Sequence, residues 1–151
     1  MSSVTAQTTN SVCSSSVAIL TPVVPISGAY TVNSNQSGTT FSVTQTGAGY
    51  TINLPSPVGN NGVNYKFVIA SDAVAGVVNL TSTAQNIMGC IINHIDAQAN
   101  IAGVVNLAAG ALQTTISMIT QSNRGDACSF ISNGTNWIVS GATHVVVWTS
   151  A

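Results

Sequence analysis

Three side chains that could carry catalysis or bind a metal lie in one apolar segment. Cys90, His94 and Asp96 have the same parity, so in a strand all three would point to one face. A strand rises about 3.3 Å per residue, which holds Cys90 and His94 roughly 13 Å apart, too far to share one ion. No serine or cysteine nucleophile motif accompanies them. The segment therefore predicts no catalytic residue, no metal site and no cofactor, and a hydrolase or metal protein is kept only as a third class of function.

The one concentrated charge feature is the tripeptide Arg124, Gly125 and Asp126. It matches the sequence that integrins read on exposed loops, and the three residues are therefore a candidate receptor-binding loop. The structural alternative is a turn in which Gly125 supplies backbone freedom while the two charged side chains stay solvated.

Charge is nearly absent from the rest of the chain. Of 151 residues, two are Lys or Arg and three are Asp or Glu, while 45% are hydrophobic. One lysine and one arginine make no basic patch, and no glycine-rich phosphate loop is present, so nucleic acid is not an expected partner. A surface with so little charge does not repel other surfaces, and we expect it to be covered by neighbouring subunits.

Membrane insertion and disorder are both disfavoured. The longest apolar stretch, 99–112, is shorter than the roughly 18 residues of a span and contains Asn100 and Asn106. Disorder usually combines low hydrophobicity with high net charge, and this chain has a net charge of -1. The opening residues show no secretory signal or lipidation pattern. An odd number of widely spaced cysteines, Cys13, Cys90 and Cys128, predicts free thiols in a reducing compartment.

The chain divides into a Ser/Thr-rich N-terminal arm, 1–16, which could exchange between subunits, and a single domain, 17–151. Short Val, Ile, Thr, Tyr and Phe runs between Gly, Pro, Asn and Ser predict strands throughout the domain. They are expected near 17–20, 29–33, 40–44, 49–54, 65–70, 76–81, 87–92, 102–107, 114–120, 127–131, 136–140 and 144–149. The expected fold is all-β, a single antiparallel β-sandwich of jelly-roll-like form.

Three local features complete this picture. Asn133-Gly134 predicts a tight hairpin that delivers Trp137 to the core. Segments 75–80 and 102–107 both read Ala-Gly-Val-Val-Asn-Leu, but a lone pair of matches does not predict a solenoid. Trp148, three residues from the last residue given, is a candidate for a subunit interface.

Several segments resemble tail-fibre-like and capsid-associated proteins of phages and large double-stranded DNA viruses. The resemblance covers 27–141 and rests on Tyr-Thr-Ile-Asn-Leu-Pro (50–55), Gly-Val-Asn-Tyr-Lys-Phe (62–67) and Phe-Ile-Ser-Asn-Gly-Thr-Asn-Trp (130–137), with Ser-Gly-Ala-Tyr-Thr-Val (27–32) before them. Such a resemblance implies a β-rich module, commonly trimeric, displayed on a particle. It implies no catalytic residues.

The sequence therefore predicts a structural virion protein and no enzyme. The expected role is a minor capsid or capsid-decorating subunit that self-associates as a trimer, binds the major capsid protein and is assembled in the host cytoplasm. The alternative is a host-attachment fibre or knob module that binds a glycan or an integrin-like receptor through loops such as 124–126.

Overall fold

The computed structural model describes residues 21–71, 76–84, 86–94, 102–106, 112–118, 123–143 and 146–149, with the backbone alone for 93–94, 102–106 and 146–149. The predicted arm at 1–16 and the predicted strand at 17–20 lie outside these ranges.

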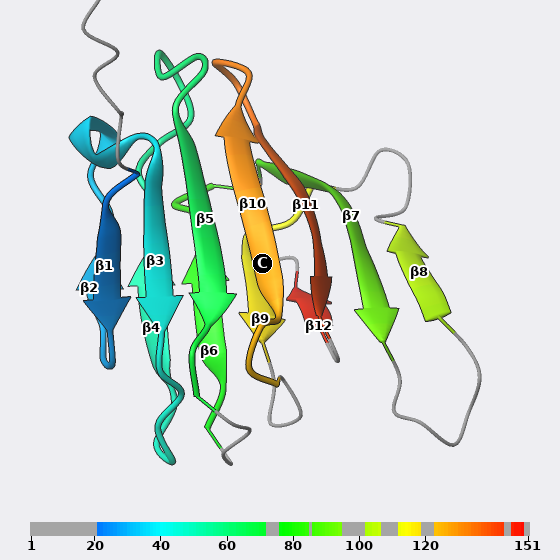
Figure 1. The fold of residues 1–151 in the computed structure, drawn as a ribbon. Coiled ribbons are helices and arrows are strands. Elements are labelled where there is room, and N and C mark those ends of the chain that lie inside the picture. The colour runs from blue at the N-terminus through cyan, green and yellow to red at the C-terminus, as the bar shows by residue number, and fades with distance from the viewer. Residues whose placement is uncertain are drawn as a thin grey trace, which may run out of the picture.

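Twelve strands and one short 3-10 helix, η1 (Ser34–Gln36), make up the described fold. A seven-stranded sheet lies in front of a five-stranded sheet (Figure 1), so the all-β class is confirmed. Within the described residues no helix is long and apolar enough to cross a membrane. The seven-stranded sheet consists, in spatial order, of β1 (Val23–Ile26), β3 (Thr39–Val43), β5 (Asn64–Ile69), β10 (Ala127–Ser132), β11 (Trp137–Thr143), β7 (Ile87–His94) and β8 (Ala102–Asn106). The five-stranded sheet consists of β12 (Val146–Thr149), β9 (Thr115–Met118), β6 (Val78–Thr81), β4 (Tyr50–Asn53) and β2 (Tyr30–Thr31).

The first six strands alternate between the two sheets. The odd-numbered strands of this half lie in the seven-stranded sheet and the even-numbered strands in the five-stranded sheet. As a result, β1, β3 and β5 are parallel neighbours, as are β2, β4 and β6. The prediction of a purely antiparallel sandwich is therefore wrong. The physical reason is that a strand in the opposite sheet makes the return crossing, which leaves successive strands of one sheet pointing the same way. The jelly-roll connectivity is not confirmed.

Antiparallel pairing dominates in the second half of the chain. β10 and β11 form the predicted hairpin, in which the N–H of Asn133 donates to the carbonyl of Asn136 at 3.1 Å. The Asn133 side chain accepts from the N–H groups of Thr135 and Asn136, and Gly134 takes a φ of 88°, a conformation that favours glycine. β11 then pairs in parallel with β7, which makes the seven-stranded sheet mixed.

Aromatic side chains fill the space between the sheets. Phe41 on β3 and Phe67 on β5 occupy the same register position, and their rings stack with centroids 5.1 Å apart. Phe130 meets Phe67 edge-on at 5.6 Å, and Trp137 contacts both Phe130 and Tyr65. Trp137 is fully buried, as expected, and large rigid rings in such pairs dominate the packing energy of a core.

β1 is a strand that the sequence did not predict. Pro22 and Pro25 argue against a strand, because proline cannot donate to a ladder. The carbonyls of Pro22 and Ile26 accept from Thr40 and Thr44, so the backbone of Pro25 points away from β3, toward the outer edge. Proline is tolerated there, and it leaves the outer edge without one N–H group that a further strand could use.

Replacing Pro25 with threonine should make this edge more adhesive. Pro25→Thr restores an outward N–H donor on an edge strand, and we expect more edge-to-edge association in light-scattering measurements. Val23→Thr is the matched control, because it places the same side chain on the same strand without adding a backbone N–H group. Equal association of the two variants would show that the proline does not protect the edge.

Candidate functional site

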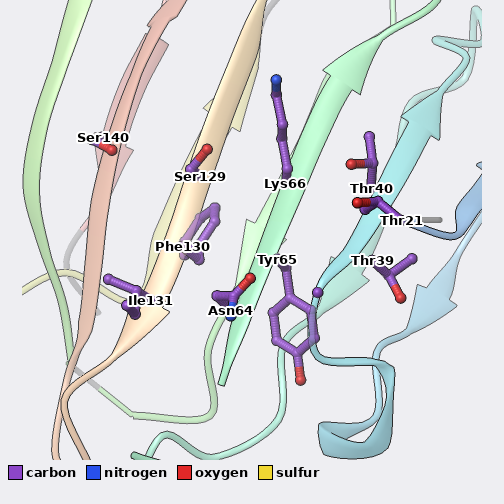
Figure 2. A pocket seen from close by; sticks show the side chains of 11 residues that line it. Thr21, Thr39, Thr40, Asn64, Tyr65, Lys66, Ser129, Phe130, Ile131 and Ser140 are labelled. Atoms are coloured by element: carbon purple, nitrogen blue, oxygen red, sulfur yellow. The ribbon is translucent and has the colours of Figure 1, made fainter. Parts of the chain in front are cut away.

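An open groove of about 600 Å³ crosses the outer face of the seven-stranded sheet (Figure 2). Four polar side chains in one register row cross it, one from each of four adjacent strands: Thr40, Lys66, Ser129 and Ser140. Neighbouring strands lie about 4.8 Å apart, so the hydroxyl groups form a regular line on both sides of the ammonium group. The groove can supply hydrogen bonds and one positive charge.

Beside this polar row the same face carries large apolar side chains. Ile131 on β10 lies opposite Ile138 on β11, which lies opposite Met88 on β7. Their exposed fractions are 47%, 39% and 39%, and Ile92, four residues along β7 from Met88, is 41% exposed. We call these four side chains the Ile138 patch. A contiguous apolar patch on a sheet face is a common mark of an interaction surface.

The outer face of the five-stranded sheet is different. On β2, β4, β6 and β9 every outward position holds threonine, asparagine or serine: Thr31, Thr51, Asn53, Asn79, Thr81, Thr115 and Ser117. Neighbours on this face bond to each other, since Ser117 Oγ donates to Asn79 Oδ1 at 2.7 Å and the hydroxyls of Thr81 and Thr115 lie 3.2 Å apart. This hydroxyl and amide face suits water, so among the described side chains an exposed apolar patch belongs to the seven-stranded sheet only.

The segments that carry the resemblance to virion proteins come together at one end of the sandwich. Trp137 Nε1 donates to the carbonyl of Pro55 at 3.1 Å, and Ser132 Oγ donates to the carbonyl of Pro57 at 2.9 Å. The Tyr65 hydroxyl donates to the carbonyl of Asn33 at 2.9 Å, and burial raises the pKa of Tyr65 to about 12, so this donor stays protonated. These three side chains, on β5, β10 and β11, bind the carbonyls of two loops, 32–38 and 54–63, and so hold those loops against the seven-stranded sheet.

The Arg124 loop is a turn at the start of β10. Arg124 and Gly125 are exposed, and Gly125 has a φ of 97°, so the glycine supplies the backbone freedom that was expected. Asp126 is only 7% exposed, and its carboxylate accepts the N–H of Asn123 at 2.9 Å. A receptor that reads the carboxylate would have to compete with this bond, and receptor binding by these residues stays a prediction.

The thiols and the other titratable groups do not form a reactive centre in the described residues. Cys90 is half-buried on the outer face of β7, and His94 ends the same continuous strand, while Asp96 lies outside the description. Cys128 is a free, fully buried thiol whose pKa burial raises well above its ordinary value, which makes it a poor nucleophile. No group of three His, Cys, Asp or Glu side chains in the described ranges could hold a metal ion. Cys13 lies outside the described residues.

Trp148 lies on β12, opposite Ile116 of β9 in the ladder. β12 is the last strand of the five-stranded sheet on that side, so its outer edge is unpaired within the described part of the chain. The description covers only its backbone, and an interface role for the indole stays a prediction.

Sequence reasoning missed the Ile138 patch, although a signal was present. In β7 the apolar residues Ile87 and Ile91 alternate with Met88 and Ile92, so both faces of the strand are apolar. Such a pattern is typical of a strand covered on both sides. Among the described residues, Ile87 and Ile91 are buried between the sheets, whereas Met88 and Ile92 are exposed.

Comparison of the chain with protein-family models, with curated proteins and with solved structures finds no match in any of the three. The resemblance to virion proteins therefore stays a prediction.

Removing the Asp126 carboxylate should destabilise the fold. Asp126→Ala leaves the Asn123 N–H without its partner, and we expect the free energy of unfolding to fall by about 1 to 2 kcal/mol in urea denaturation. Asp126→Asn, which keeps an acceptor oxygen, should lose less. An unchanged stability of Asp126→Ala would mean that the carboxylate is not held in the turn and is available to a receptor.

Proposed function

We propose that this chain is a structural subunit of a larger protein assembly, and specifically a minor capsid or capsid-decorating protein of a large double-stranded DNA virus. In this role it self-associates as a trimer, binds the major capsid protein and has no catalytic activity. The observation that carries the proposal is the Ile138 patch, a set of exposed apolar side chains on a sheet face that carries almost no charge.

The charge distribution supports an adhesive role. On the outer face of the seven-stranded sheet, Lys66 is the one charged side chain among the described residues. The whole chain has two basic and three acidic residues. Contacts made by such a surface depend on apolar burial and on hydrogen bonds from Ser, Thr, Asn and Gln. Neither contribution is screened by salt to the extent that ion pairs are.

The virion part of the proposal rests on the sequence resemblance. The segments that carry it are joined by the hydrogen bonds of Trp137, Ser132 and Tyr65, so they share a role in building the module. The alternative, a host-attachment module that binds a glycan or an integrin-like receptor, rests on the exposure of Arg124 and Gly125. The buried carboxylate of Asp126 makes this second proposal the weaker one.

Self-association should be insensitive to salt. Size-exclusion chromatography with light scattering should give a particle of three copies of the 15.3 kDa chain, with the same mass at about 0.1 M and about 1 M salt. Dissociation at the higher salt concentration would show that charge pairs hold the assembly. A single-copy particle at high concentration in plain buffer would overturn the structural-subunit proposal itself.

The virion assignment has a separate test. Quantitative mass spectrometry of purified particles of the virus that encodes the chain should detect it at a fixed ratio to the major capsid protein. Absence from the particles, or a source genome that is not viral, would overturn the assignment while leaving the self-association result intact.

A further inference from the structure

We infer that copies of this chain bind one another through the Ile138 patch, with Ile138 at the centre of the contact. The inference rests on the proposed function and goes beyond it, with a second copy of the chain as the occupant. A face that binds the same face of a second copy closes as a twofold contact, so it pairs copies or trimers and is separate from the contact that builds a trimer.

The geometry makes Ile138 the centre of the patch. Ile131 lies beside it on β10 and Met88 beside it on β7, both in the same register row, while Ile92 extends the patch along β7. No charged side chain of the described residues lies within this set. A contact made here would have the apolar, fully desolvated centre that carries most of the binding energy in protein interfaces.

The polar groove residues form the rim of such a contact. Lys66 is on β5, two strands from Ile138, because the order is β5, β10, β11. Two strand spacings amount to about 10 Å, so the ammonium group lies outside the apolar centre but within the face that a neighbour covers. Ser129 and Ser140 lie in the same register row as Lys66, next to the row of Ile131 and Ile138, and their hydroxyls can bond to carbonyls or hydroxyls of a neighbour.

The five-stranded sheet shows that this chain can form an outer face of polar side chains that suits contact with water. The described outward positions of the five-stranded sheet are all Thr, Asn or Ser, whereas the outward positions of β10, β11 and β7 include one register row with three large apolar residues, Ile131, Ile138 and Met88, and a further one at Ile92. Because the two outer faces belong to one molecule with one composition, a general shortage of polar residues does not explain the difference. The apolar face is therefore one that a neighbour covers.

A second copy has the chemistry that the face requires. A partner with many charges would have to desolvate them against a surface that offers no counter-charge near Ile138, which costs free energy. This face is itself open, pleated and almost neutral, so two copies meet without like-charge repulsion. Sheets that pack face to face lie about 10 Å apart, a distance that side chains of the size of isoleucine and methionine fill from both sides.

The area available is sufficient. Seven strands at about 4.8 Å and strand lengths of about 20 Å give a face of roughly 650 Å², and two such faces bury on the order of 1,300 Å². Specific interfaces begin at about 1,200 Å² of total buried surface. The whole face is needed for a stable contact, so the rim residues belong to the interface as well as the apolar centre.

The test places a charge at the centre of the patch. Ile138→Lys should raise the dissociation constant of the assembly about tenfold or more in sedimentation velocity, because the new ammonium group must be desolvated at the centre. Met88→Lys, on the neighbouring strand, should do the same independently. Val58→Lys is the matched control: Val58 is 67% exposed on the loop between β4 and β5, outside the Ile138 patch, and this variant should associate like the original chain.

A fourth variant tests the position of the rim. Lys66→Met should leave the association unchanged or strengthen it, because it removes the one charge that the covered face must desolvate. Loss of association in Lys66→Met would show that Lys66 meets a required carboxylate, which overturns the arrangement. Thermal unfolding followed by circular dichroism confirms that each variant is folded.

The outcomes separate the two proposals. If the original chain is an oligomer and Ile138→Lys and Met88→Lys leave it unchanged, the patch is not the contact and this inference fails, while the structural-subunit proposal stands. If the original chain is a single-copy particle, both fail. Dissociation of the patch variants, with Val58→Lys intact, supports the inference.

Discussion

The register between neighbouring strands is the constraint on which the rest of the structure depends. Side chains alternate between the two faces of a strand, so a slip of one residue would exchange every inner and outer position. The stacked rings of Phe41 and Phe67, and the contacts of Phe130 with Phe67 and Trp137, fix that register across β3, β5, β10 and β11. The same interior contacts therefore determine which side chains reach the outer face, including Ile131 and Ile138.

The sequence indicated the strands much better than their pairing. Strand character is local, and the β-branched and aromatic runs between turn residues located every described strand except β1, where two prolines conceal an edge position. The Asn133-Gly134 hairpin is also local and was predicted. Parallel pairing of β3 with β5 is not local, since Phe41 and Phe67 are brought together by a return through the other sheet, and no repeat in the sequence marks the winding.

The candidate site shows the same difference between local features, which the sequence indicates, and features that depend on the pairing of distant strands. The tripeptide Arg124, Gly125 and Asp126 was singled out because it matches a sequence that integrins bind. The burial of Asp126 and its hydrogen bond to Asn123 depend on how the turn folds, which the tripeptide alone does not show. The Ile138 patch has no motif, because it joins one residue from each of two strands of a hairpin with residues from a third strand far away in the sequence. Only the strand order places them side by side. By contrast, the segments that resemble virion proteins are explained by local needs of the fold, since their Trp, Ser and Tyr side chains bind loop carbonyls.

Because its two outer faces differ in chemistry, a single molecule has one polar side and one more apolar side. The described side chains on the outer face of the five-stranded sheet carry hydroxyl and amide groups. The outer face of the seven-stranded sheet has isoleucine and methionine side chains at its centre. At an air–water boundary, or on a hydrocarbon-coated support, such a plate would settle with the Ile138 side against the non-aqueous phase and the threonine-rich side in the liquid. Monolayers of this chain would accordingly be oriented, and their wettability would be set by the five-stranded sheet.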